Sequence, residues 1–170
     1  MKRKQSGFSL VELLIVVLII GIIAAIAIPN LLAARRSANE GSAISTLRTL
    51  HGAQSLYLTS FGAGNYAGTA GSTGDSVVLS DLYAKQLIDD ALRFGSKSGY
   101  NFVGAKTIAN ALTPATFFFS ANPITASGST QTGTKKFCVT QMGFIGFDWN
   151  DLSTPFDETT APTATPISSQ

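Results

Sequence analysis

The sequence predicts an α+β fold in which a long N-terminal helix packs on a small antiparallel sheet of three to four strands. One observation is the uncharged apolar run Leu13–Ala34, which continues into a segment with helical spacing of its apolar residues. The other is a group of short runs, rich in aromatic and β-branched residues, in the C-terminal half. A chain of 170 residues has room for one modest domain beside such a helix.

The N-terminal helix is expected to run from Phe8 to about Leu58. Its first half is apolar throughout, and Leu13–Ala34 would span roughly 33 Å as a helix, enough to cross a hydrocarbon core of about 30 Å. Its second half is amphipathic, because small and apolar residues recur at steps of three and four along one face. These residues are Ala43, Leu47, Leu50, Ala53 and Tyr57.

Two residues interrupt the apolar half of this helix. Pro29 removes the backbone donor that would bond to the Ala25 carbonyl, and Gly21 lowers local helix stability. We expect the helix to bend or melt between them, although membrane helices also tolerate both residues without a break.

A cleaved secretory signal is the alternative interpretation of the N-terminus. Lys2, Arg3 and Lys4 would form its basic end, and Ala25-Ile26-Ala27 its cleavage site. The apolar run continues beyond that site, which favours a membrane anchor.

The remaining chain predicts a small head. A helix is expected from Ser80, with Ser80 as its N-cap, to about Gly95, followed by an antiparallel meander. The Gly/Ser/Thr-rich segment 60–76 is expected to be an exposed loop, 126–133 a linker, and 151–170 an extended, poorly ordered tail rich in Thr and Pro. The predicted strands are Gly99–Val103, Thr116–Ala121, Lys135–Thr140 and Phe144–Asp148.

Composition argues against several classes of function. The net charge is only +2, so no broad basic surface predicts nucleic-acid binding. One histidine and one cysteine provide no metal or catalytic cluster, and we predict no enzyme, no cofactor and no metal site. His51 is expected to flank the packing face of the helix, and Cys138 to be buried in a strand. Consecutive residues Phe117–Phe119 should alternate between the two faces of their strand.

Four acidic residues near the C-terminus leave one metal hypothesis open. These residues, Asp148, Asp151, Asp157 and Glu158, would suit calcium, although their spacing is not that of an EF-hand. A solvated acidic loop is the alternative.

The start of the apolar run contains two unusual residues. Gly7 precedes Phe8 at the foot of the helix, and Glu12 places a carboxylate where a membrane segment is otherwise uncharged. A charged side chain at the centre of a membrane helix costs roughly 2.5 to 3.5 kcal/mol, which makes such a residue a functional candidate. Glu12 also lies near the end of the span, where its carboxylate would reach the membrane interface.

These residues together resemble the processing and assembly signal of the type IV pilins: a basic leader ending in Gly7, then Phe8, then Glu12 and an apolar helix. The resemblance implies that a prepilin peptidase cuts between Gly7 and Phe8 and methylates the new amine of Phe8. The chain would then consist of a leader (1–7), a membrane and filament-core half of the helix (8–34), a head (35–150) and the tail.

The resemblance also implies a role for Glu12 in assembly. Its carboxylate would meet the amine of Phe8 in a neighbouring subunit, and pairing the two charges reduces the cost of burying both. Other implied partners are further pilin subunits, an inner-membrane platform protein and an assembly ATPase.

The implied function is that of a structural subunit of a type IV pilus. The precursor would lie in the bacterial inner membrane, and the processed chain in an extracellular filament, or fimbrium, that serves motility, adhesion or DNA uptake. Two alternatives remain: a pseudopilin of a type II secretion system, and a singly anchored periplasmic binding protein.

Overall fold

The computed structural model describes residues 7–167 except 72 and 111, so that of the predicted leader only Gly7 lies among the described residues. The chain divides into two compact units, 1–35 and 36–170. Helix α1 (Leu10–Ser60) begins in the first unit and ends in the second. The long helix is therefore confirmed, with each end two residues further along the chain than the sequence predicts.

The second unit contains a six-stranded antiparallel sheet in which the strands lie in sequence order. The four predicted strands are all present, and the meander is confirmed. Two further strands, at opposite edges, contain only two residues each and are too short to produce a periodic pattern. The strands are β1 (Ser96–Lys97), β2 (Tyr100–Thr107), β3 (Thr116–Pro123), β4 (Lys136–Thr140), β5 (Ile145–Asp148) and β6 (Thr165–Pro166).

One face of the sheet packs against the outer half of α1 and against α2 (Val77–Ala84). We call this cluster the helix-facing core. The amphipathic pattern predicted it, since Ala43, Leu47, Leu50 and Ala53 are buried in it and Tyr57 packs against it. From the strands it contains Tyr100, Phe102, Phe117, Phe119, Ala121, Phe137, Val139 and Ile145.

The predicted start and end of the second helix are wrong. Its N-cap is Ser76, and Ser80 lies inside the helix, where its Oγ donates a hydrogen bond to the Val77 carbonyl at 2.7 Å. The helix starts earlier because Val78 belongs to its buried side. It ends at Ala84, and Gln86, with φ of 57°, turns the chain into the separate 3₁₀ helix η1 (Asp90–Leu92).

The loop 60–76, which its composition predicts to be exposed, makes several contacts with the rest of the head. Most of its side chains are exposed, but Ala67 is fully buried. Asp75 forms a bridge with Gly104 of β2, and Thr73 forms one with Asp157. The sequence shows no sign of these contacts, because they are made by the backbone.

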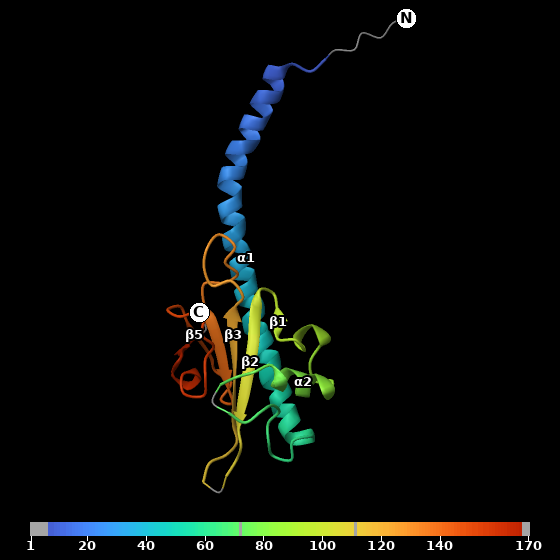
Figure 1. Cartoon of the computed structure of the whole chain (residues 1–170), viewed down its shortest axis with the longest axis vertical. Helices are drawn as coiled ribbons and strands as arrows, with labels where there is room; N and C mark the ends of the chain where they lie inside the picture. The colour runs from blue at the N-terminus through green and yellow to red at the C-terminus, as the bar shows by residue number, and fades with distance from the viewer. Residues whose placement is uncertain (1–6, 72, 111, 168–170) are drawn as a thin grey trace, which may run out of the picture. The chain divides into compact units, whose positions relative to one another are not determined.

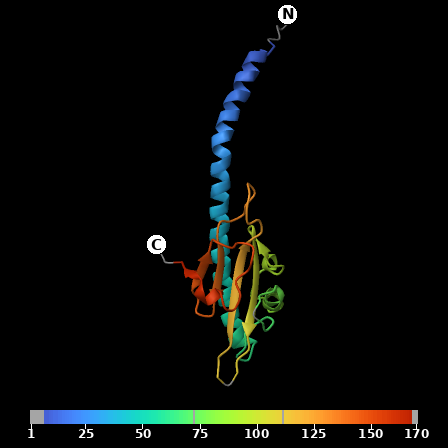
Figure 2. The ribbon, with the colours of Figure 1, turned by 60° about the vertical axis from the view of Figure 1, so that its left-hand side comes forward.

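Up to residue 167 the predicted tail is not an extended segment, because it folds back onto the sheet. Phe156 and Ala161 are buried, and a 3₁₀ helix, η2 (Ala161–Thr163), leads into β6, which pairs with β5. Figures 1 and 2 show this segment at the β5 edge of the sheet and α2 at the β1–β2 edge. The segment folds back because the second face of the sheet is also apolar and requires a cover.

Candidate assembly site

The Glu12 carboxylate lies at the first turn of α1 and accepts a hydrogen bond from the backbone N–H of Ser9 at 2.9 Å. Leu13 N–H in turn donates to the Ser9 carbonyl at 3.2 Å. Ser9 precedes the helix, and Glu12 is the third helical residue, which is the arrangement in which a glutamate caps its own helix. The spacing Ser-x-x-Glu could have predicted this contact from the sequence.

Phe8 lies outside the helix, since α1 begins at Leu10. Because Phe8 and Ser9 are not helical, the helical rise of about 1.5 Å per residue does not set the distance between Phe8 and Glu12. Phe8 is highly exposed, at 77%. Its backbone nitrogen is thus not fixed by the helix that positions Glu12.

Gly7 is not required by the fold of the residues that the structure describes. A Cβ atom added at Gly7 would meet no atom within 4 Å, and the residue does not adopt a positive φ. The contacts of the described residues therefore do not explain a requirement for glycine at this position.

The apolar half of α1 presents an almost uniform surface. Leu10, at 78%, and the large apolar residues that follow are exposed as far as Leu31, and Glu12 is the only charged residue from Leu10 to Ala34. By length and composition, α1 is the one helix among the described residues that could cross a membrane. Gly21 and Pro29 both lie inside α1, which continues as α-helix through them.

The outer half of α1 is held by the β3–β4 loop, a contact that the sequence does not predict. Asn39 Nδ2 donates to the Thr132 carbonyl at 2.9 Å. Glu40 Oε1 accepts hydrogen bonds from both the backbone N–H and the hydroxyl of Thr134, each at 2.7 Å. The predicted linker 126–133 is thus a fixed contact to the helix.

The four C-terminal acidic residues each have a partner within the head, and for Asp151 and Asp157 these partners are nearby hydroxyl and backbone N–H groups. Asp151 Oδ1 accepts from Ser153 and Thr154, and these hydrogen bonds lower the pKa of Asp151. Hydrogen bonds from Thr159 and Thr160 lower the pKa of Asp157 to about 2. Asp148 pairs with Lys136, and Glu158 accepts from Thr107. Within the described part of the chain, no three His, Cys, Asp or Glu side chains are grouped so that they could hold a metal ion.

His51 and Cys138 take the positions that the sequence predicts. His51 Nε2 lies 3.3 Å from the Gln141 carbonyl, and its ring lies 5.7 Å from that of Phe117, at the flank of the helix-facing core. Cys138 is buried in β4, and burial raises the pKa of its thiol to about 12. Such a thiol is protonated at neutral pH and is a poor nucleophile.

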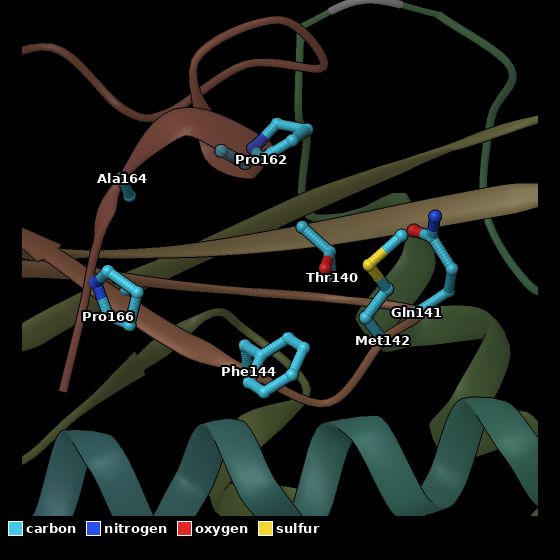
Figure 3. Close-up of a pocket in the computed structure, with 9 residues that line it drawn as sticks. Thr140, Gln141, Met142, Phe144, Pro162, Ala164 and Pro166 are labelled. Carbon is cyan, nitrogen blue, oxygen red and sulfur yellow. The ribbon is translucent and has the colours of Figure 1, made fainter. Parts of the chain in front are cut away.

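The head also contains a small pocket of about 120 Å³ between the β4–β5 turn and the C-terminal segment. Figure 3 shows Pro162, Ala164 and Pro166 facing Thr140, Gln141 and Met142, with Phe144 beside them. No side chain of the lining is titratable, so the pocket provides no group for acid–base chemistry.

Comparison with known proteins identifies the N-terminal region. The model of the prokaryotic N-terminal methylation motif matches residues 2–28. The type II secretion system core protein G of Aeromonas hydrophila is 39% identical over 56 residues, which are 33% of this chain and 39% of the relative. No solved structure matches significantly.

Two pilus proteins are also similar to part of this chain. The type IV wide pilus major component PilA4 of Thermus thermophilus is 63% identical over 38 residues, 22% of this chain and 29% of the relative. The type IV major pilin protein PilA of Myxococcus xanthus is 43% identical over 56 residues, 33% of this chain and 26% of the relative. The chain thus spans well under half the length of these curated relatives.

These relatives are named as components of pili and of secretion systems. The methylation-motif model covers residues 2–28, which include Gly7, Phe8 and Glu12, and the head has the expected helix-on-sheet architecture. The chain therefore carries the prokaryotic N-terminal methylation motif and is a distant homologue of the type IV pilins and of type II secretion core protein G.

Proposed function

We propose that the chain is the structural subunit of a type IV pilus, cut between Gly7 and Phe8, methylated at Phe8 and polymerised through the apolar half of α1. The observation that carries this proposal is the exposed apolar surface of Leu10–Leu31 with a single carboxylate, Glu12, at its start. In a membrane this surface faces lipid, and in a filament it faces the same surface of neighbouring subunits.

Glu12 would make that assembly selective. In the single chain its carboxylate is satisfied by the Ser9 N–H. In a filament, the methylated amine of Phe8 from a neighbouring subunit would provide a charged partner. A buried charge without a partner is strongly destabilising, so only the correct stagger between subunits would be tolerated.

The partners of this process follow from its steps. A prepilin peptidase would cut and methylate the chain at the inner membrane, and an ATPase acting through a platform protein would supply the work of extraction. Lipid is as apolar as the helix, so burial alone does not drive the helix out of the membrane. Gly21 and Pro29 would allow the helix to bend or melt as subunits pack.

A pseudopilin of a type II secretion system is the second candidate. Core protein G from several bacteria is among the relatives, at 33–40% identity over 55–57 residues. The two candidates differ in the location of the finished polymer, which is the cell surface for a pilus and the periplasm for a pseudopilus.

Mass spectrometry and electron microscopy of sheared surface material test the proposal. We expect filaments containing this chain with methylated Phe8 as the first residue. The pseudopilin is favoured if the mature, methylated chain is absent from the surface material and if protein secretion requires this chain. Finding only membrane-bound monomer would contradict both and favour an anchored binding protein.

A further inference from the structure

The sheet of the head has two separate apolar faces, each covered by different elements. The face opposite α1 carries a second cluster of Ala105, Phe118 and Cys138 from β2, β3 and β4. We call its cover, residues 151–167, the C-terminal strap. The strap contributes Phe156 and Ala161 to this cluster, with Ala164 packed against it. Among the described residues, none of the strap belongs to the helix-facing core.

Lys136 connects the strap to the sheet. Its side chain, only 7% exposed, lies on the strap side of β4, where Nζ donates to the Thr154 carbonyl at 3.0 Å. The same ammonium lies 4.5 Å from the centroid of the Phe156 ring and 3.7 Å from Oδ2 of Asp148. Two of these three partners belong to the strap, so a closed strap provides most of what stabilises the buried charge.

Buried polar side chains of β3 reinforce the contact. Ser120 Oγ accepts from the Phe156 backbone N–H at 2.9 Å and donates to Asn122 Oδ1 at 2.7 Å. Asn122 Nδ2 in turn donates to the Leu152 carbonyl at 3.2 Å. The strap is thus held by a connected polar network and two buried side chains.

No covalent bond supplements these contacts. The chain has one cysteine, so no intramolecular disulfide can tie the strap to the sheet. The pairing of β6 with β5 extends over only two residues, and so short a pairing is weak by itself. The strap therefore depends mainly on Lys136, the Ser120 network and the burial of Phe156, to which the Thr73–Asp157 bridge and the hydrogen bond from Thr107 to Glu158 add single contacts.

We infer that the C-terminal strap opens as a unit while the helix-facing core stays folded, and that the Lys136 ammonium is its lock. Opening would uncover the apolar face around Phe118 and expose the Cys138 thiol, whose Sγ lies 3.5 Å from the Ala161 carbonyl in the closed state. Segments that lie outside the main core of a domain commonly open separately. The lock would keep an apolar sheet face from forming contacts with other molecules.

Alkylation of Cys138 measures strap opening directly, because the full chain has no other thiol. The full chain in detergent micelles is treated with iodoacetamide over a series of urea concentrations, and global unfolding is followed in parallel by near-ultraviolet circular dichroism. At low urea we expect a labelling rate that depends weakly on urea, because opening the strap exposes little surface. At high urea the rate should follow global unfolding.

Two variants in the same strand separate strap opening from global unfolding. Lys136→Met keeps an unbranched side chain but removes the charge, and should raise the low-urea labelling rate at least tenfold. Val139→Ala acts on the opposite face, in the helix-facing core. It should lower the urea midpoint of global unfolding and leave the low-urea labelling rate unchanged, because the core is intact in the closed and the open strap alike.

If Lys136→Met does not fold, Phe156→Leu tests the same contact from the strap, because it removes the ring beside the Lys136 ammonium. This variant should also raise the labelling rate of Cys138 at low urea. The inference is overturned if wild-type labelling follows global unfolding at every urea concentration, or if Val139→Ala accelerates low-urea labelling in proportion to its loss of global stability. Either result would mean that strap and core unfold as one unit.

Discussion

The side-chain amide of Gln54 pairs with the backbone of Ala67 in both directions. The Ala67 N–H donates to Gln54 Oε1 at 2.8 Å, and Gln54 Nε2 donates to the Ala67 carbonyl at 3.2 Å. Both residues are fully buried. The amide of Gln54 thus pairs with the backbone of Ala67 as a neighbouring strand would, and it fixes the central part of the loop 60–76 to α1.

Replacing Gln54 with leucine should be strongly destabilising. The change fills a similar volume but leaves the N–H and C=O of Ala67 buried without partners, at a cost of roughly 1–3 kcal/mol for each group. Urea unfolding of the full chain in detergent should show a loss of about 2 kcal/mol or more. Ser55→Ala, on the exposed side of the same helix, is the control and should change stability by less than about 0.5 kcal/mol. If the Gln54→Leu chain is as stable as the wild-type chain, water must reach the N–H and C=O of Ala67 in the variant.

Gly104→Ala should disturb the sheet where the loop crosses it. An added Cβ would lie 2.5 Å from Cδ1 of Phe119 and 2.7 Å from the carbonyl of Phe118, so the helix-facing core must shift. We expect a loss of about 1–3 kcal/mol in the free energy of unfolding. Gly71→Ala meets open space and provides the matched control. A loss no greater than that of the control would mean that the ring of Phe119 moves without cost.

Glu12 variants separate its two roles. Glu12→Ala and Glu12→Val should leave cutting at Gly7-Phe8 largely intact and greatly reduce filament yield, as judged by mass spectrometry and by sheared filaments. Glu12→Gln keeps an oxygen that can accept the Ser9 N–H but removes the charge. If charge pairing selects the register of subunits, Glu12→Gln should assemble as poorly as Glu12→Ala. Recovery of filaments with glutamine would instead assign the effect to helix capping.

Asp157 makes the stability of the head depend on pH under acid conditions. A carboxyl group whose pKa is lower in the folded state stabilises that state above its unfolded pKa, and this contribution is lost as pH falls through the folded pKa. For Asp157 the window lies between about 4, the unfolded value, and about 2, the folded value. The side chain is largely solvated, so its contribution should not exceed about 1 kcal/mol.

Asp157→Asn checks this pH dependence, because it retains one side-chain oxygen as acceptor but loses the charge. The thermal midpoint of the variant should be lower than that of the wild-type chain at pH 6, and the two should converge near pH 2. A difference that stayed constant from pH 6 to pH 2 would rule out the carboxylate as its source.

The sequence by itself determined the long helix, the four main strands and the N-terminal methylation motif. These features depend on local patterns: an uncharged apolar run, aromatic and β-branched runs, and the spacing of Gly7, Phe8 and Glu12. The two faces of β3 were also predictable, and Phe118 indeed lies in a different cluster from Phe117 and Phe119.

Only the tertiary structure decided how the loops and the C-terminal strap are used. The Thr/Pro-rich tail has the composition of a solvated terminus, yet it packs on the sheet because Phe118, Cys138 and the Lys136 ammonium present a surface that needs a partner. Similarly, the contact of Gln54 with Ala67 joins a side chain to a backbone 13 residues away. Such contacts depend on the shape of the folded sheet, and residue type and spacing do not encode them locally.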